Sequence, residues 1–305
     1  MTPDDTSSTP GEAFLSGEAL NVLNQRLALL EPTQILEWAC LTFPQVHQST
    51  AFGPSGLVIT DLLHNLRVQW ALKHGAASSA LPESTSLDSI TPTDSSTLPQ
   101  STTLANPFEV PLIFLDTLYH FEETLALVDQ VRQRYQAMIH VYRPAQCETR
   151  AAFEAQFGTE LWRTEEAMYD YLVKVEPARR AYQKHGVRVV ITGRRRSQRG
   201  ERAQIPIIEV EKGTGLIKLN PLAYWSFDKV WAYLRANEVP YNALLDQGYR
   251  SIGDVHSTKP TAGTDDERSG RWEGQAKSEC GLHKDYFAMR KAFMEAKERR
   301  VKLGL

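Results

Sequence analysis

Apolar and polar positions along the chain predict an alternation of helices and short buried strands. Apolar residues recur every three or four positions over 18–42 and 59–66, and helices are also predicted from 121, around 150–156, over 162–172, from 226 and from 286. Continuous apolar runs over 110–115, 137–142 and 187–192 fit buried parallel strands. A pair over 205–210 and 216–219 predicts an edge hairpin. With 305 residues, one α/β domain with appendages or two small domains is expected.

Three segments depart from this pattern and set the expected domain boundaries. Residues 1–17 are rich in Ser, Thr, Pro and Asp, which is typical of disorder. Residues 75–107 are low in complexity and predict a surface insertion within an α/β domain over 18–250. From 251 to 305 the chain becomes polar before its last helix, which predicts a C-terminal tail.

Charge and composition narrow the classes of partner. A formal charge of -3 argues against non-specific binding of nucleic acid, which needs a basic surface. The N-terminus lacks the basic and apolar regions of a secretory signal, and no apolar run is long enough to cross a membrane. We therefore expect a cytoplasmic protein with neither nucleic acid nor membrane as its partner.

The chain has three cysteines, Cys40, Cys147 and Cys280, and none belongs to a C-x-x-C pair. This spacing disfavours a disulfide scaffold, a zinc site and an all-cysteine cluster, so no metal is expected. Cys40 and Cys147 are predicted to be structural. Cys280 lies in segment 277–283, KSECGLH, where Lys277 and His283 would lower the pKa of its thiol. A free cysteine is more often a small buried apolar residue, and this alternative stays open.

Two loops have residue types suited to anions. Segment 49–56, STAFGPSG, opens a helix, so its backbone amides and the helix N-terminus can bind a phosphate or sulfate. A plain Gly/Pro turn with Ser55 as N-cap is equally consistent. Segment 193–202, GRRRSQRGER, follows a predicted strand and carries five arginines. Its place at a strand end favours anion binding over a solvated basic loop.

A third polar pair, Asp116-Thr117, follows the strand at 110–115. Ligands of open α/β sheets bind beyond the carboxyl ends of the strands, so Asp116 is placed where a ribose or phosphate partner would lie. Capping of the next helix by Asp116 is an equally good interpretation.

Together these motifs resemble the phosphoadenylyl-sulfate (PAPS) reductase family. Segments 49–56, 115–117, 174–177 (KVEP), 193–198, 246–249 (DQGY), 253–256 and 277–283 occur in the family's order over about 45–284. The resemblance implies an adenine-nucleotide α-hydrolase-like fold, which is a parallel twisted sheet with helices on both faces, and a mobile C-terminal tail. It also implies reduction of PAPS to sulfite and adenosine 3′,5′-bisphosphate, through an S-sulfocysteine on Cys280 that reduced thioredoxin or glutaredoxin resolves.

The resemblance assigns roles to particular residues. The expected catalytic residue is Cys280. The residues expected to bind substrate are Ser49, Gly53, Ser55, Gly56, Asp116, Thr117, Arg195, Arg196, Gln198, Arg202, Lys259, Lys277 and His283. A homodimer is implied, and no bound cofactor.

Related iron–sulfur adenylyl-sulfate reductases carry paired cysteines before a Glu-Pro, where this chain has Lys174-Val175. An iron–sulfur cluster is therefore not expected, and PAPS is favoured over adenylyl sulfate. The chain departs from the family at the 75–107 insertion and at Pro260, where a basic residue is expected. Two other functions fit parts of the sequence: a PP-loop ATP pyrophosphatase or adenylyltransferase, which does not need Cys280, and a non-catalytic nucleotide-binding redox module.

Overall fold

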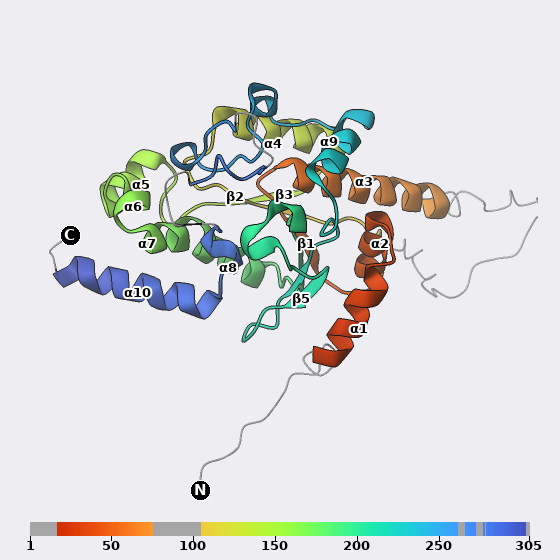
Figure 1. Cartoon of the computed structure of the whole chain (residues 1–305), viewed down its shortest axis with the longest axis horizontal. Helices are drawn as coiled ribbons and strands as arrows, with labels where there is room; N and C mark the ends of the chain where they lie inside the picture. Colours follow the sequence, from red (N-terminus) through yellow and green to blue (C-terminus); the bar gives the residue numbers. More distant parts are fainter. Residues whose placement is uncertain (1–16, 76–104, 262–265, 273–276, 278, 303–305) are drawn as a thin grey trace, which may run out of the picture.

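A six-stranded sheet in the order β3-β2-β1-β4-β6-β5 forms the centre of the structure (Figure 1). This computed structural model describes residues 17–75, 105–261, 266–272, 277 and 279–302. The strands are β1 (Val46–Ser49), β2 (Leu112–Leu115), β3 (Ile139–Tyr142), β4 (Val189–Ile191), β5 (Ile208–Val210) and β6 (Ile217–Leu219). Only β5 runs antiparallel to its neighbour, β6, at the edge of the sheet. The predicted strands and the edge hairpin are confirmed, with shorter bounds.

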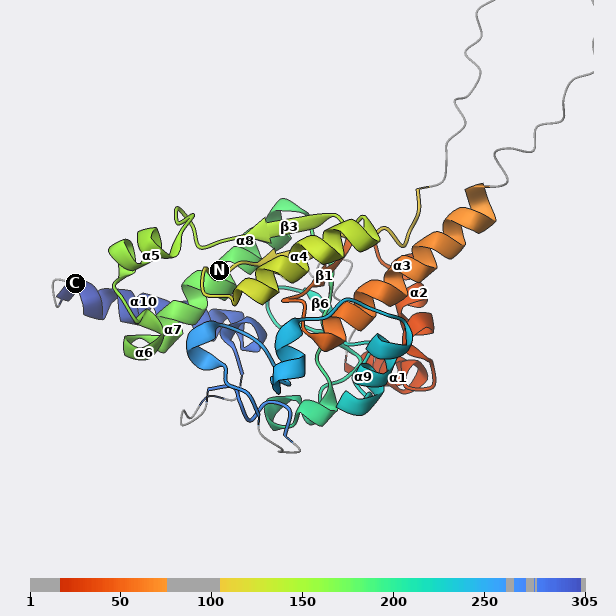
Figure 2. The same ribbon diagram turned by 90° about the horizontal axis from the view of Figure 1, so that it is seen from above.

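Helices cover both faces of the sheet, as predicted. They are α1 (Gly17–Leu27), α2 (Pro32–Thr42), α3 (Pro54–Gly75), α4 (Glu122–Tyr135), α5 (Arg150–Phe157), α6 (Leu161–Thr164), α7 (Glu166–Asp170), α8 (Glu176–Lys184), α9 (Phe227–Ala236) and α10 (Tyr286–Lys302). Apolar residues of α2, α3, α4 and α9 pack on one face, and those of α8 pack on the other. Helices α10 and α7 lie at the opposite end of the molecule from α1 and α9 (Figure 2).

Two of the three cysteines lie in apolar cores. Cys40 belongs to the large core under α2 and α3, and Cys147 belongs to a separate cluster that includes Phe153 and Tyr169. Burial raises the pKa of Cys40 to about 12, so its thiol stays protonated at neutral pH. The prediction that both cysteines are structural is confirmed.

The helix expected over 162–172 is divided. Between α7 and α8 the chain forms a π-helical turn, Tyr171–Val175, so that the run from Glu166 to Lys184 stays helical with one widened turn. A π-turn carries one residue more than an α-helical turn and occurs often at functional sites. Here it contains Lys174.

Strand β1 is central, yet it was not predicted from the sequence. Its residues His47 and Gln48 are buried although they are polar. The Gln48 amide donates to the Gly56 carbonyl (2.7 Å) and accepts from the Thr60 hydroxyl (3.1 Å), so α3 satisfies it. Because the strand lacks an apolar run, its pattern resembles that of a loop.

Much of the predicted disorder and insertion lies outside the described residues. Residues 1–16 and 76–104 are not described, so these predictions stay untested. The described part of the tail lies against the carboxyl end of the sheet, and its predicted mobility stays a prediction. Within the described ranges, no helix combines the length and the apolar character needed to cross a membrane.

A buried carboxylate fixes α3, the helix that begins at the 49–56 loop. Asp61 accepts hydrogen bonds from the hydroxyls of Tyr135 at the end of α4 (3.0 Å) and Tyr233 in α9 (2.7 Å), and from the Asn65 amide (3.1 Å). Asp61 is 5% exposed, so this hydrogen bonding compensates the loss of hydration.

We predict that Asp61→Ala lowers the free energy of unfolding by about 2–4 kcal/mol, because two tyrosine hydroxyls lose a charged acceptor. Urea unfolding followed by circular dichroism measures this change. Asn65→Ala, at an exposed position that bonds the same carboxylate, is the control and should change it by less than about 0.5 kcal/mol. Equal effects of the two variants would contradict this role of Asp61.

Candidate active site

A cavity of about 230 Å³ lies beyond the carboxyl ends of β1, β2 and β4. Ser49, Leu115 and Thr192, which end or follow these strands, line it. Strand β1 has β2 and then β3 on one side, and β4, β6 and β5 on the other. The cavity therefore lies at the point where the order of the strands reverses. Ligands of open α/β sheets bind at such a point. The tail forms the opposite wall through parts of 250–254, 267–272 and 279–283.

The 49–56 loop leads directly from β1 into the first turn of α3, which begins at Pro54. A Cβ on Gly56 would lie 2.4 Å from the Thr50 hydroxyl oxygen, so only glycine fits there. A Cβ on Gly193, after β4, would lie 3.0 Å from the Gly56 nitrogen. The two loops thus touch through their backbones, and the positive end of the α3 dipole faces the cavity.

Arg195 connects the two loops to the tail. Its guanidinium donates to the hydroxyls of Ser55 and Ser197 (both 2.7 Å) and to Glu267 (2.5 Å). Arg195 is 1% exposed, and Glu267 supplies the counter-charge that a buried cation needs. An arginine predicted from the sequence to bind phosphate is therefore paired with a carboxylate of the tail in this structure.

Arg202 is paired in the same way. It contacts both oxygens of Glu279, at 2.5 and 2.7 Å, and donates to Gln198 at 2.6 Å. Burial would raise the pKa of Glu279, but Arg202, which contacts both of its oxygens, and Arg268 hold it well below its usual range. Glu279 therefore remains a carboxylate beside the thiol of Cys280.

Cys280 lines the cavity and is partly exposed. Burial, followed by the charge of Glu279, raises the pKa of its thiol, whereas Lys174 and Arg202 oppose the rise. In this arrangement the thiol is mainly protonated at neutral pH. The sequence predicted Lys277 and His283 as its activators. Burial lowers the pKa of His283 well below its usual value, so His283 is neutral here.

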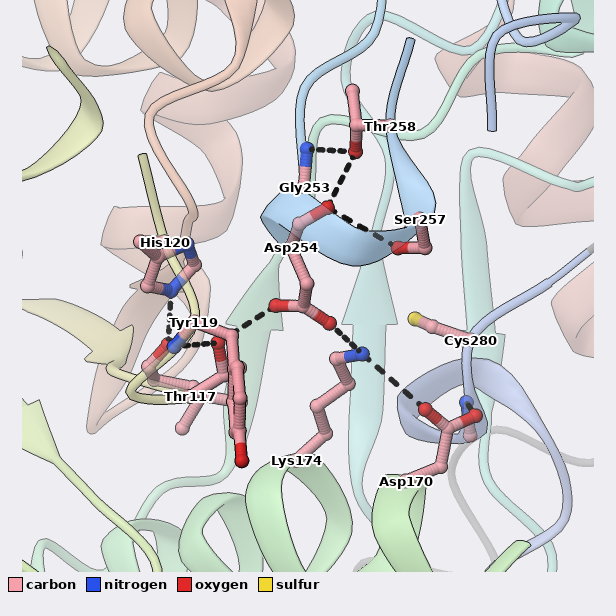
Figure 3. A network of polar contacts seen from close by, with 12 residues as sticks. Thr117, Tyr119, His120, Asp170, Lys174, Gly253, Asp254, Ser257, Thr258 and Cys280 are labelled. Carbon is pink, nitrogen blue, oxygen red and sulfur yellow. Dashed lines mark hydrogen bonds and ion pairs between the residues drawn. The ribbon is translucent and has the colours of Figure 1, made fainter. Parts of the chain in front are cut away.

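A network around Lys174 fixes the tail next to the sheet (Figure 3). Lys174 lies between Asp254 (2.8 Å) and Asp170 (3.2 Å). Asp254 also accepts from the Thr117 hydroxyl after β2 (2.7 Å), and Asp170 accepts from the Gly281 amide (3.0 Å). Figure 3 shows that the Cys280 side chain points toward the ammonium of Lys174.

Both carboxylates of this network stay ionised. Burial would raise the pKa of Asp254, but Lys174 and His120 outweigh it and hold it far below its usual value. Burial opposes ionisation of Asp170 in the same way, and Lys174 and Lys277 lower its pKa. Burial would lower the pKa of Lys174, and the two carboxylates raise it instead. Lys174 therefore carries a positive charge beside the thiol.

The structure brings most of the predicted site residues together. The cavity is lined by Ser49, Gly53, Ser55, Gly56, Thr117, Arg195, Gln198, Arg202, Cys280 and His283. Four lie outside its lining. Asp116 accepts from Arg143 (2.8 Å), and Arg196 donates to the Ile205 carbonyl (2.8 Å). Lys259 is exposed.

Lys277, the fourth, is paired with Asp170 (2.6 Å) and Glu166 (3.2 Å) behind the thiol. The proposed capping of α4 by Asp116 does not occur, because the N-cap residue of α4 is Phe121. Asp116 instead accepts from the Leu118 amide within its own turn (3.0 Å).

Sequence reasoning did not assign several charged residues of the lining. These are Lys174, Arg194, Arg250, Asp254, Glu267, Arg268, Arg271 and Glu279. Lys174, Arg194, Asp254 and Glu279 lie inside the matched segments 174–177, 193–198, 253–256 and 277–283, so a signal existed for them. Arg268 and Arg271 lie in a polar segment without any pattern and enter the site only through the fold.

The cavity does not offer the ligands of an iron–sulfur cluster. Such a cluster needs about four thiolate ligands. The three cysteines lie in different parts of the structure, two of them inside apolar cores. Glu279, Cys280 and His283 place one ligand atom each within 4.8 Å of one another, which is the one set of possible metal ligands found among the described cavity residues.

The fold and the cavity define an α/β protein of the adenine-nucleotide α-hydrolase-like class, with a thiol in its ligand site. Residues 45–260 match the profile of the phosphoadenosine phosphosulfate reductase domain. The chain is 46% identical to the phosphoadenosine phosphosulfate reductase of Emericella nidulans over 87% of its own length and 74% of the relative. It is 41% identical to that of Saccharomyces cerevisiae over 89% and 92%.

A solved structure agrees. The phosphate complex of PAPS reductase from Candida auris is 41% identical and superimposes with a TM-score of 0.62, covering 80% of this chain and 98% of the other. An adenosine 5′-phosphosulfate reductase of Bacillus subtilis is 30% identical over 84% and 91% of the two chains. The chain therefore belongs to the phosphoadenosine phosphosulfate reductase family and is an oxidoreductase acting on a sulfur group.

The raised pKa of Cys280 leads to a pH prediction. Because the thiolate is the nucleophile, alkylation of Cys280 by iodoacetamide should be slow at pH 7 and rise steadily with pH to above 9. Lys174→Met should slow it further at every pH, because an opposing cation is lost. Peptide mass spectrometry follows each cysteine, with Cys40 as the buried reference. A rate that levels off near pH 7 would contradict the protonated thiol.

Proposed function

We propose that the chain reduces PAPS to sulfite and adenosine 3′,5′-bisphosphate, with reduced thioredoxin or glutaredoxin as electron donor and Cys280 as nucleophile. The observation that carries the proposal is that Cys280 shares one cavity with the 49–56 loop and the arginine loop. The names of the relatives point to the same substrate. A thiol is not needed for transfer of an adenylyl group, so its place in the cavity favours the reductase over the adenylyltransferase.

The charge of the cavity supports a nucleotide with several anionic groups. Seven cations line it among the described residues: Lys174, Arg194, Arg195, Arg202, Arg250, Arg268 and Arg271. Three carboxylates face them, which are Asp254, Glu267 and Glu279. Two of the cations, Lys174 and Arg194, also pair with Asp170 and Glu209 outside the lining. The predominance of cations in the lining suits a nucleotide with several anionic groups, such as PAPS with its 3′-phosphate and phosphosulfate group.

In the first step the Cys280 thiolate attacks the sulfur of the sulfonate group. A bond forms between Sγ and this sulfur, and the bond to the bridging phosphate oxygen breaks. Adenosine 3′,5′-bisphosphate leaves with that electron pair and S-sulfocysteine remains. The ammonium of Lys174 stabilises both the thiolate before attack and the sulfonate after it. The covalent intermediate on Cys280 divides one difficult reduction into two thiol reactions.

Deprotonation of the thiol follows from substrate binding in this proposal. When the phosphates pair with Arg202 and its neighbours, Glu279 no longer has to balance them and can move away from Sγ. Loss of this carboxylate removes a charge that raises the pKa of Cys280. The thiol of Cys280, which is partly exposed, then gives its proton to the solvent. The nucleophile thus forms when the substrate is present.

In the second step a thiolate of the donor attacks Sγ of Cys280. The Sγ–sulfonate bond breaks and sulfite leaves with its electron pair. The second thiol of the donor then displaces Cys280, which yields a donor disulfide and regenerates the Cys280 thiolate, with two electrons supplied by the dithiol. Cys280 must become accessible to a protein for this, so the contacts of Glu279 with Arg202 and of Gly281 with Asp170 must open.

The roles of the other residues complete the proposal. Backbone and hydroxyl groups of Ser49, Gly53, Ser55 and Gly56 bind a phosphate or the sulfonate, and Thr117 borders the adenosine. Arg195, Gln198 and Arg202 bind phosphates, with Arg196 beside them. His283 faces the sulfonate. Asp116, Lys259 and Lys277 do not line the cavity, so their contribution to substrate binding is indirect. A homodimer rests on the family resemblance alone, whereas a cytoplasmic location and the absence of a bound cofactor were also expected from the sequence.

Two measurements separate this proposal from both alternatives. Reduced protein incubated with PAPS without thioredoxin should gain the mass of one SO₃ on the peptide that contains Cys280. Thioredoxin should then release it as sulfite. Binding of PAPS without an adduct would support the non-catalytic module. A Cys280→Ser variant that kept full enzymatic turnover would support the adenylyltransferase, because that activity does not need the thiol.

The arginine loop offers a matched pair of variants. Arg202→Ala should raise the KM for PAPS by about tenfold or more, because a buried charged hydrogen bond to an anion is lost. Arg199→Ala removes an equal charge at an exposed position of the same loop, outside the cavity, and should change the KM by less than about twofold. Steady-state kinetics at fixed ionic strength measures both. Similar increases in KM for both variants would show that the loop acts through its overall charge and not through a direct contact of Arg202 with the substrate.

A further inference from the structure

Three histidines from distant parts of the chain meet under the sheet. His47 is in β1, His140 is in β3, and His185 directly follows α8. One ring nitrogen of each lies within 4.8 Å of the others. All three are on the α8 side of the sheet and near the amino ends of the strands, whereas the cavity with Cys280 lies beyond the carboxyl ends.

From this cluster we propose that His47, His140 and His185 bind a divalent ion of the late first-row transition metals, with Zn²⁺ as the reference ion. Three imidazoles with a fourth position for water are a familiar ligand set for zinc. Imidazole also suits Cu²⁺ and Ni²⁺, and the absence of a carboxylate among the three ligands disfavours Ca²⁺ and Mg²⁺.

The hydrogen bonds of the rings leave nitrogens available for a metal. His47 Nδ1 lies 3.3 Å from the Gln45 carbonyl, so Nδ1–H donates there and Nε2 stays free. His185 Nε2 lies 3.0 Å from the Tyr142 hydroxyl, which leaves Nδ1. Histidines that bind metals usually have their second nitrogen held in this way.

The rings need only a small movement to close around an ion. Two nitrogens bound to a tetrahedral Zn²⁺ are roughly 3.4 Å apart, against the 4.8 Å within which these atoms lie. The ring centroids of His140 and His185 are 4.0 Å apart in a stacked arrangement, and those of His47 and His185 are 5.7 Å apart. His140 and His185 are partly exposed, so they can rotate and an ion can enter.

The surroundings support a neutral ligand set. Burial lowers the pKa of His47 and of His140, and the neighbouring imidazoles lower both further, so these rings are unprotonated at neutral pH. The C-terminal end of α8, next to His185, carries a partial negative charge that favours a cation. The positive charge of Lys184 opposes this attraction for a cation, and it also lowers the pKa of His140. An ion here would join β1, β3 and the end of α8, and would stabilise the fold without entering the reaction.

The test uses full-length protein freed of metal and carrying Cys280→Ser, which removes the thiol of the other set of possible ligands. Isothermal titration with Zn²⁺ should give one equivalent with micromolar affinity or tighter, together with a rise in Tm. His140→Gln and His185→Gln should each weaken binding at least tenfold. His74→Ala, on α3 and with its ring against that of Trp70, is the control and should bind as the parent does.

Circular dichroism and Tm without metal show whether each variant is folded. Co²⁺ gives a readout that needs no histidine variant, because tetrahedral nitrogen ligation produces visible absorption bands without a thiolate charge-transfer band. No saturable Zn²⁺ binding and no such bands in the Cys280→Ser protein would overturn the proposal. Binding that is unchanged in both glutamine variants would overturn it as well.

Discussion

The ion pair of Lys174 with Asp254 and Asp170 is the interaction on which the site depends. A charge buried without a partner costs several kcal/mol, so these groups must stay together. Through Asp254 the network holds the 250–258 segment to the end of β2, and through Asp170 it holds the backbone of Gly281. The position of Cys280 relative to the sheet follows from these two connections.

The same principle governs the rest of the cavity. Arg195 and Arg202 are inside the protein and balanced by Glu267 and Glu279 of the tail. These carboxylates form ion pairs with the arginines that an anionic substrate would have to contact. Substrate binding and movement of the tail are therefore coupled in our account, because an incoming phosphate replaces a carboxylate of the tail. The raised pKa of Cys280 is part of the same coupling, since Glu279 contributes to it.

Sequence reasoning predicted the parts of the structure that depend on local pattern. Helices and apolar strands were found, and so were the loops that follow β1 and β4, because periodicity and strand ends carry these signals. Strand β1 was missed because its buried residues His47 and Gln48 are polar, so it has no apolar run; their hydrogen bonds to the Gln45 and Gly56 carbonyls, which satisfy them, leave no mark in that pattern. The π-turn that places Lys174 has no pattern of its own. The sequence also could not show which charges pair. Lys277 was expected to bind substrate, yet it pairs with Asp170.

The central claim is that PAPS binds in this cavity with its sulfonate directed at position 280. A crystal structure of Cys280→Ser with bound PAPS tests it most directly. We expect the sulfonate sulfur at about 3–3.5 Å from the side-chain oxygen at position 280, the phosphates on the arginine loop, and Glu279 released from Arg202. A nucleotide bound elsewhere, or one whose sulfonate points away from position 280 while Glu279 still pairs with Arg202, would contradict the account.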